Sequence, residues 1–534
     1  MVFCMFRESS IIKDWRNIDL SFGLIYPNNY TLGMSSYSIR LLYHIINLTE
    51  NYVCERIFLP EKIQFPASKD FSPINSLRSI ENKILPKDFD ILGFSGHYEN
   101  DYKNILWILE KSEIPLESKK RHGENSLKLD EYPLIIGGGP AITSNPLPLS
   151  NIFDLFFIGD AEPNLNTFFD VFLEYKSKIS NFEGFFNKVK NIEGIYIPLL
   201  NNKTNRVILE DLNQSPTPAY QLLSNRESDK KIFEENYFVE INRGCPFQCK
   251  FCISSFHNYP FRNKSYDEII TAIQTGIKFS DFEKISLIGS CVSSHPKFSE
   301  ICEFILNVGK LFSIPSIRID HITPKIIQLL EKSGVKTITI APETGSESLR
   351  YDLGKKITND KILDVLKLIK ESRIKNVKFY FLVGLPNETD EDIKEIIKFF
   401  KSIEKIGFKH NELRVNVKPF IPKPNTPYEN QCYHYLSENL NNFRLKFSTL
   451  KQQLNKISSL KIKFKEPKSI INNARLQALF SLGDRNISNL LLAYYFNGAN
   501  MGALRRAEKE LDFSINDYLK KVQDGYKPWK FSNK

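Results

Sequence analysis

Three cysteines lie within eight residues, in the stretch Cys245-Pro246-Phe247-Gln248-Cys249-Lys250-Phe251-Cys252. Residues 236–241, just before it, are mostly apolar and predict a short β-strand that ends in this loop. Thiolate is the soft ligand that iron–sulfur clusters need, and such clusters normally take four protein thiolates. Three ligands on a cubane leave one iron open to chelate a small molecule through an amine and a carboxylate. The sequence therefore predicts a 4Fe-4S cluster held by Cys245, Cys249 and Cys252.

Zinc is the alternative metal for these thiols, and three unrelated cysteines are the simplest alternative. A zinc site needs paired cysteine units and a fourth Cys or His at a suitable spacing. His257 is the only histidine close to the loop in the sequence. The spacing therefore favours the cluster.

Length, composition and the remaining cysteines indicate the number of domains and the compartment in which the protein works. The 534 residues predict about three domains. The net charge of +10 is a mild excess that favours an anionic partner only weakly, so nucleic acid is not excluded. No apolar run approaches the ~20 residues that a membrane helix needs. Single, scattered cysteines in a large chain fit a reducing compartment, and we expect a cytoplasmic protein without a transmembrane segment. These cysteines are Cys4, Cys54, Cys291, Cys302 and Cys432.

The N-terminal part, residues 1–199, alternates between apolar runs and amphipathic stretches. Strands are expected over 22–26, 53–59, 89–94, 133–136 and 155–158, with helix-like segments between them. Such alternation predicts a Rossmann-like parallel sheet with helices on both faces. Ligands of these sheets bind at the carboxyl ends of the strands, where Ser95, Gly137 and Gly138 are found. The stretch 112–132 is polar and predicts a surface insertion.

The central part, residues 233–430, follows a linker over 200–232 and contains six strand–helix units. Six such units with right-handed crossovers predict a partial (β/α)6 TIM-type barrel, whose third strand is expected over 316–319. Residues 431–534 predict a mostly helical C-terminal domain. Within it Lys461, Lys463 and Lys465 alternate with apolar residues, which predicts a strand with a basic face.

The spacing CxxxCxxC, with Phe251 before its last cysteine, resembles the cluster loop of the radical SAM superfamily. The resemblance implies that the open iron binds the methionine end of S-adenosylmethionine (SAM). Three later strand ends also resemble the family. Leu287-Ile288-Gly289-Ser290 stands where relatives hold the methionine amino group, Glu343 at the fourth-strand motif would face the ribose or the amino acid end, and the turn at Gly384-Leu385-Pro386 would lie along the adenine.

The N-terminal part resembles the cobalamin-binding domain that precedes the radical SAM core in one subgroup. Ser95, Gly137 and Gly138 stand where that domain contacts the nucleotide tail of the cofactor. The DxHxxG motif that supplies an axial histidine is absent, because the corresponding loop reads Pro27-Asn28-Asn29-Tyr30-Thr31-Leu32-Gly33. Cobalamin would then bind without that histidine. The alternative is that the glycines only form tight turns in a vestigial domain.

Several polar residues near these strand ends have a structural interpretation. Glu347 and Glu388 are at apparent helix starts, where acidic side chains favour the helix dipole. A lone cysteine such as Cys291 usually serves packing. For His97 and His321 we expect satisfied structural histidines.

Taken with the resemblance, these features predict a radical SAM enzyme that acts on an unactivated C–H bond of a small-molecule or lipid substrate. Cobalamin would make it a C-methylating or C–C bond-forming enzyme, and relatives of this layout include proteins that form rings in archaeal lipids. The resemblance also implies an external electron donor of the flavodoxin or ferredoxin type. The alternatives are a nucleic-acid or protein modification enzyme of the same superfamily and a non-catalytic, cluster-stabilised binding protein. Methylthiotransferases hold a second cluster on three N-terminal cysteines, whereas this half offers only Cys4 and Cys54.

Overall fold

The computed structural model describes residues 10–66, 77–121, 131–176, 182–221, 236–462 and 466–530. The chain forms two compact units. The first contains Met1–Glu234 together with Leu479–Ile515 and Lys527–Lys534, and the second contains Glu235–Ala478 together with Asn516–Tyr526. Among the described helices, none combines the length and apolar character that crossing a bilayer requires.

The first unit is built on a six-stranded sheet of order β2-β1-β3-β4-β5-β6, in which only β6 is antiparallel to its neighbour. The expected Rossmann-like sheet is therefore present, and its five predicted strands are confirmed to within a few residues. Its elements are β1 (Leu20–Asn29), α1 (Tyr30–Met34), α2 (Tyr37–Asn47), β2 (Tyr52–Leu59), β3 (Ile91–Ser95), α3 (Tyr102–Lys111), α4 (Ser118–Arg121), β4 (Leu134–Gly138), α5 (Pro140–Ser144), β5 (Leu155–Phe157), α6 (Leu165–Lys176), α7 (Phe182–Val189) and β6 (Ile195–Tyr196).

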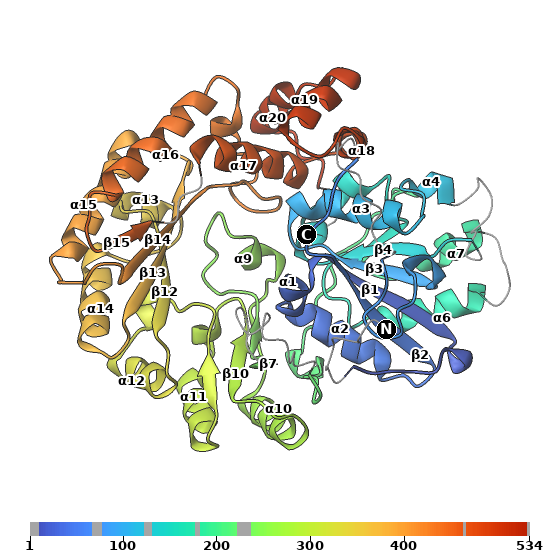
Figure 1. Cartoon of the computed structure of the whole chain (residues 1–534), viewed down its shortest axis with the longest axis horizontal. Helices are drawn as coiled ribbons and strands as arrows, with labels where there is room; N and C mark the ends of the chain where they lie inside the picture. The colour runs from blue at the N-terminus through green and yellow to red at the C-terminus, as the bar shows by residue number, and fades with distance from the viewer. Residues whose placement is uncertain are drawn as a thin grey trace. The chain divides into compact units, whose positions relative to one another are not determined.

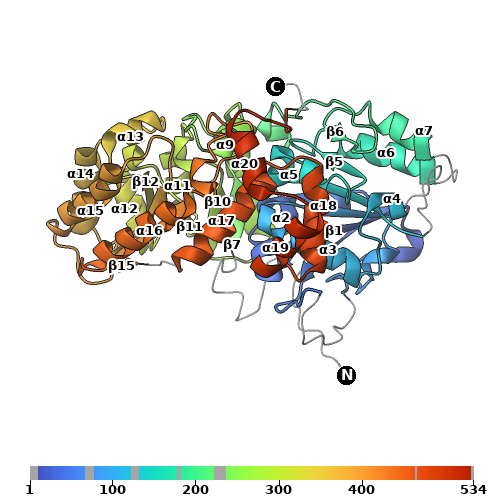
Figure 2. The same ribbon diagram turned by 90° about the horizontal axis from the view of Figure 1, so that it is seen from above.

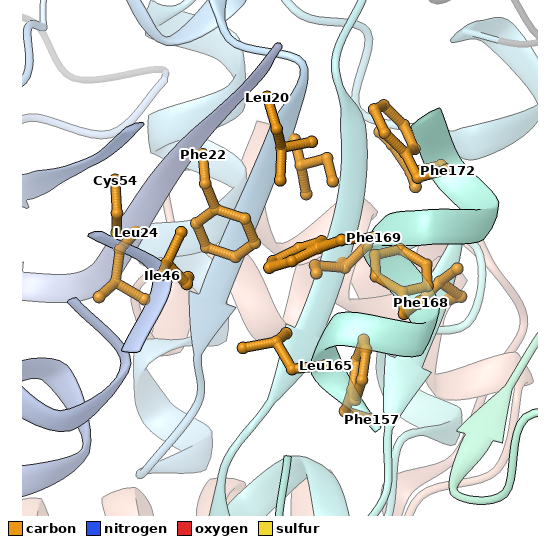
Figure 3. Close-up of a cluster of buried hydrophobic side chains, with 14 of the residues drawn as sticks. Leu20, Phe22, Leu24, Ile46, Cys54, Phe157, Leu165, Phe168, Phe169 and Phe172 are labelled. Atoms are coloured by element: carbon orange, nitrogen blue, oxygen red, sulfur yellow. The ribbon is translucent and has the colours of Figure 1, made fainter. Parts of the chain in front are cut away.

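Aromatic side chains fill the core on one face of this sheet. Helix α6 places Phe168, Phe169 and Phe172 over the strands, and the ring of Phe169 meets that of Phe22 edge-on at 5.9 Å (Figure 3). The four rings are 3% exposed or less. The three rings of α6 recur at helical spacing, and Leu20, Phe22 and Leu24 alternate along β1 in the same buried cluster, so each element turns one face to this core.

A segment from the C-terminal region completes the first unit. It contains α18 (Asn486–Phe496) and α19 (Met501–Glu510), and α18 packs beside α3 (Figure 2). Asn145 Nδ2 donates hydrogen bonds to the carbonyl oxygens of Ser481, at 3.1 Å, and Gly483, at 2.7 Å. The sequence predicts one helical domain over 431–534, whereas the structure divides these residues between the two units. Such long-range hydrogen bonds leave no local pattern in the sequence.

The predicted surface insertion over 112–132 contains a buried arginine. Arg121 and Asp154 have side chains that are both 0% exposed, and Arg121 Nη2 lies 2.7 Å from Asp154 Oδ1. Asp154 also accepts hydrogen bonds from Ser118 Oγ and from the backbone N–H of Ile135. The prediction of a surface insertion is wrong for Arg121, whose buried partner lies 33 residues further along the chain.

The second unit contains seven parallel strands in two sheets, ordered β11-β10-β7 and β12-β13-β14-β15, and most of its helices line the outer side of the strands (Figure 1). This is the expected partial barrel. Its elements are β7 (Asn236–Glu240), β8 (Asn242–Arg243), α9 (Ile253–His257), β9 (Arg262–Asn263), α10 (Tyr266–Phe279), β10 (Lys284–Ile288), α11 (Phe298–Asn307), β11 (Leu311–Ser313), α12 (Pro324–Lys332), β12 (Thr337–Glu343), α13 (Glu347–Asp352), α14 (Asn359–Glu371), β13 (Asn376–Val383), α15 (Asp390–Glu404), β14 (Leu413–Pro419), α16 (Leu440–Leu454) and β15 (Leu460–Ile462). Helix α17 (Pro467–Ser481) crosses from this unit into the first, and α20 (Ile515–Gln523) belongs almost wholly to the second.

The third strand differs from the prediction. It is β11, and Ile319–His321, at the end of the predicted strand, form a turn of 3-10 helix instead. Pro315 lies between them and has no N–H to donate to a sheet ladder, so the strand ends before it. Of the predicted basic strand, only Lys461 is described, on β15; Lys463 and Lys465 lie outside the described residues.

Candidate active site

The three-cysteine loop lies at the carboxyl end of β7, after the short β8. Cys249 is 7% exposed, while Cys245 and Cys252 are partly exposed. The loop turns tightly because Gln248 has a φ of +47° and the N–H of Cys252 donates to the carbonyl of Cys249 at 2.9 Å. Helix α9 begins directly after Cys252. The chain therefore presents its three thiols from one loop at the end of the strand that the sequence predicted.

The thiols are free, as are all seven described cysteines. Burial raises the pKa of Cys249 to about 11, against the opposing effect of the cationic Lys355 and Arg318. Cys245 and Cys252 also lie close enough to influence this pKa. A set of three neighbouring free thiols beside cations fits the three ligands of an iron–sulfur cluster. Within the described ranges, no group of three or more His, Cys, Asp or Glu side chains is arranged to hold a single metal ion.

The loop is braced by aromatic and cationic side chains. The guanidinium of Arg318 lies 3.4 Å from the ring centroid of Phe247, and the ring of His321 lies 5.7 Å from the same centroid. His321 Nδ1 in turn shares a hydrogen bond of 2.9 Å with Ser293 Oγ. Arg318 is held by Asp320 through two hydrogen bonds of 2.9 and 2.8 Å. These contacts fix the loop segment between the first two cysteines.

Phe251 anchors the other half of the loop in a small apolar cluster. Its ring packs against a buried cluster from the end of α13, the turn after β13 and the segment after β14. The members of this cluster are 0–8% exposed: Leu349, Leu353, Leu385, Phe420 and Tyr428. Two hydrogen bonds also tie the cysteine loop to this cluster. Asp352 accepts from Lys250 Nζ and from Tyr428 Oη, both at 2.8 Å. The cluster loop and the turn that contains Leu385 are thus brought together.

The strand end at β10 lies beside the first thiol. Gly289 has no room for a side chain, because a Cβ there would lie 2.1 Å from Asn242 Oδ1. Asn242 Nδ2 donates to the carbonyl of Cys291 at 2.9 Å, while Ser290 is exposed. Cys291 shares hydrogen bonds with the thiol of Cys245 and with Ser294 Oγ. The sequence alone suggested packing for Cys291, and nothing local in it signals this contact.

Glu343 ends β12 with a φ of +69°, a region that a glutamate rarely occupies. Its Oε1 accepts a hydrogen bond of 2.8 Å from Lys355 Nζ, and both side chains are nearly buried. Lys355 also donates to the carbonyl of Ala341. Strained backbone and a nearly buried ion pair at a strand end are typical of functional sites. By contrast, Glu347 lies in the first turn of α13, so its predicted position at a helix start is confirmed, and it also caps α14 by accepting from the N–H of Asn359.

The turn after β13 holds Gly384, Leu385 and Pro386, and Glu388 closes it. Both carboxylate oxygens of Glu388 lie 3.0 Å from the N–H of Gly384. The predicted helix-start role of Glu388 is wrong, because Thr389 and Asp392 form the capping box of α15 and Glu388 points back into the turn. Burial raises the pKa of Glu388 to about 7, although Lys446 and the backbone N–H groups oppose this.

Gly384 allows a test of how tightly this turn is packed. Its φ is +87°, and a Cβ would lie 2.6 Å from the ring of Phe443 on α16. Gly407 has the same φ with no neighbour within 4 Å. We expect Gly384→Ala to lower the free energy of unfolding by at least about 1 kcal/mol more than Gly407→Ala. Urea unfolding of both variants measures the difference, and equal losses would show that the ring of Phe443 yields freely.

In the first unit, the residues predicted to contact cobalamin lie at the carboxyl edge of the sheet. Ser95 ends β3 and shares a hydrogen bond of 3.0 Å with His97 Nε2, and burial lowers the pKa of His97 to about 4. A Cβ on Gly137 would lie 3.0 Å from the side chains of Ile142 and Phe153, so internal packing already explains this glycine. Gly138 is more open, with its nearest contact at 3.8 Å.

Two parts of the chain match models of known protein families. Residues 38–198 match the family described as "Radical SAM proteins, N-terminal", and residues 239–400 match "Radical SAM superfamily". The two matches together cover more than half of the chain. The chain therefore belongs to the radical SAM superfamily, whose members use a 4Fe-4S cluster and SAM. Within it, the chain has the layout in which a Rossmann-like domain precedes the radical SAM core.

Individual relatives are more distant. An uncharacterized protein of Methanocaldococcus jannaschii is 27% identical over 96% of this chain and 98% of its own length. A putative methylthiotransferase of the same organism is 26% identical over 39% of this chain, which spans only 49% of that protein.

Two solved structures share the fold. The first is the cobalamin-dependent SAM radical enzyme OxsB with aqua-cobalamin bound. Its TM-score is 0.53 at 13% sequence identity, and the match covers 95% of this chain and 77% of the OxsB chain. The SAM methyltransferase TsrM of Kitasatospora setae, with cobalamin and a [4Fe-4S] cluster bound, has a TM-score of 0.50 at 11% identity over 77% of each chain.

Proposed function

We propose that Cys245, Cys249 and Cys252 bind a 4Fe-4S cluster and that SAM binds beside it, so that the enzyme acts on an unactivated C–H bond. The observation that carries this proposal is the apolar cluster that joins Phe251 of the cysteine loop to Leu385 of the turn after β13. It brings together two segments more than 130 residues apart that, by resemblance to the superfamily, would hold the iron–sulfur cluster and the adenine. When bound, the cluster supplies the electron that splits SAM into methionine and a deoxyadenosyl radical.

The residues of the chain then hold and shield the reactants. The three thiolates would hold three irons of the cluster. Gly289 leaves room for Asn242, which braces the end of β10 where the methionine end of SAM would lie. Glu343, oriented by Lys355 at 2.8 Å, accepts hydrogen bonds from the hydroxyl or amino groups of SAM. The apolar side chains around Phe251 exclude water, which protects a reactive radical from side reactions. An external donor of the flavodoxin or ferredoxin type supplies the electron.

SAM cleavage tests this function directly. The protein is purified without oxygen, reconstituted with iron and sulfide, reduced with dithionite and supplied with SAM, and deoxyadenosine and methionine are measured by mass spectrometry. We expect both products in equal amounts. Full cluster content without either product would instead favour a non-catalytic, cluster-stabilised binding protein.

Glu343→Gln tests the assignment of the SAM site. The amide keeps the shape of the side chain but removes the charge, so charge-assisted hydrogen bonds worth about 1.5–3 kcal/mol weaken. We expect the Kd of SAM, measured by equilibrium dialysis on reconstituted protein, to rise about tenfold. Glu347→Gln is the matched control, because Glu347 caps α14 and its loss should reduce stability without changing the Kd. Equal SAM affinity in both variants would remove Glu343 from the site.

Cobalamin-dependent chemistry, either C-methylation or C–C bond formation, is the second candidate. The fold of the first unit favours it, since its parallel sheet presents Ser95 and the open Gly138 at the carboxyl edge. The packed Gly137 and the missing axial histidine motif weigh against it. Cobalamin is therefore offered to the reconstituted protein, and bound cobalamin is measured by absorbance. Stoichiometric binding would favour methyl transfer, and no binding would leave the deoxyadenosyl radical as the reagent.

A further inference from the structure

Helix α16 connects the parallel strands β14 and β15 and packs directly against the turn that closes β13. Its buried face carries Phe443 and Phe447, each 0% exposed. The ring of Phe443 stacks on His434 with centroids 4.9 Å apart, and it occupies the space that a side chain at Gly384 would need. The turn over residues 384–388 is therefore packed against the helix that connects β14 to β15.

A buried ion pair joins the same helix to the same turn. Lys446 Nζ lies 3.2 Å from Glu388 Oε1, and the two side chains are 8% and 2% exposed. Lys446 also donates to the backbone carbonyl of Glu388 at 3.4 Å, while Asp390 lies 3.8 Å away and is largely exposed. The carboxylate that Lys446 holds is the one whose two oxygens accept from the N–H of Gly384. Lys446, Glu388 and Gly384 thus form one chain of contacts.

The charge of Glu388 explains why the contacts among Lys446, Glu388 and Gly384 matter. A buried carboxylate is costly unless a cation or hydrogen-bond donors compensate it. Without Lys446, Glu388 would favour its protonated form, and a protonated carboxyl can no longer accept with two charged oxygens from the N–H of Gly384. The turn would lose the contact that closes it. Leu385, which packs near Phe251 of the cysteine loop, would then move with it.

We propose that Lys446 is a positioning residue for SAM, because it holds Glu388 in the state that fixes the adenine-binding turn over residues 384–388. This inference rests on the proposed SAM site. In this proposal Lys446 acts on SAM binding through Glu388. The expected consequence of its loss is a protein that assembles its cluster and binds SAM weakly.

The test uses the full-length, reconstituted protein and SAM itself. Lys446→Met keeps the apolar stem and removes the charge, and Lys451→Met on the same helix is the matched control. Iron and sulfide content are measured first, and the Kd of SAM is then measured by equilibrium dialysis. We expect a full cluster in both variants, an unchanged Kd in Lys451→Met, and a Kd at least tenfold higher in Lys446→Met. An unchanged Kd in Lys446→Met would overturn the proposal.

A conservative variant separates positioning from general destabilisation. Lys446→Arg retains the charge, so it should bind SAM within threefold of the native Kd even if Lys446→Met is too unstable to reconstitute. If Lys446→Arg assembles its cluster but binds SAM as weakly as an uncharged variant, the ion pair does not position the turn. In Glu388→Gln, the further change Lys446→Met should add little, because the two residues act as a unit. Failure of the native protein to bind SAM would refute the proposed function instead.

Discussion

Cys249→Ser is expected to abolish both the cluster and SAM cleavage. Cys249 is the most buried of the three loop thiols, and a serine hydroxyl is a harder ligand that seldom replaces thiolate on iron–sulfur clusters. Loss of residues that merely support metal ligands typically costs about 10–100-fold in metal affinity or activity. Loss of a ligand itself should therefore reduce deoxyadenosine formation at least about 100-fold.

The experiment measures iron, acid-labile sulfide and deoxyadenosine in the variant after anaerobic reconstitution. Cys302→Ser is the control, because Cys302 is 1% exposed in the same unit and lies on α11, away from the loop. We expect this variant to retain its cluster. Four irons per chain in Cys249→Ser would show that the three-cysteine loop is not the ligand set.

Asp154→Ala is expected to cause the largest loss of stability. Its partner Arg121 is fully buried, so the substitution leaves a guanidinium without its counter-charge in the first unit. Removing one partner of a buried ion pair typically costs about 3–5 kcal/mol, and here the N–H of Ile135 also loses its acceptor. Urea unfolding should show this decrease in the free energy of unfolding.

The control for Asp154→Ala is an exposed pair in the same unit. Lys188 and Glu174 form an ion pair with side chains 47% and 41% exposed, and such surface pairs are worth about 0–1 kcal/mol. Glu174→Ala should therefore change the free energy of unfolding by less than about 1 kcal/mol. If Asp154→Ala costs no more than this control, the buried pair contributes nothing beyond an ordinary surface contact.

Much of the fold could be predicted from the sequence because the relevant signals are local. Apolar runs marked all five parallel strands of the first sheet. The exception is the third barrel strand, which is predicted over 316–319 but lies wholly before that range, at Leu311–Ser313, because Pro315 lacks a donor for the ladder. Periodicity finds the presence of elements more reliably than their ends.

The candidate site also combines features that the sequence predicts with features that only the structure shows. The cysteine spacing and the glycines at strand ends are read from a few neighbouring residues. The partners of charged groups cannot be read in this way, because they lie far away in the sequence. Glu347 and Glu388 look alike in sequence, each at an apparent helix start, yet one caps α14 and the other closes the turn after β13. The difference depends on Lys446, 58 residues further along the chain.

The sequence by itself determined the ligand-bearing loop, the alternation of strands and helices, and the superfamily to which the chain belongs. These depend on spacing within a single strand, helix or loop. Only the tertiary structure decided that Cys291 lies beside Cys245, that Arg121 is buried against Asp154, and that residues 479–515 belong to the first unit. Each of these is a contact between distant segments, and its stability arises from burial and charge pairing that the folded chain alone creates.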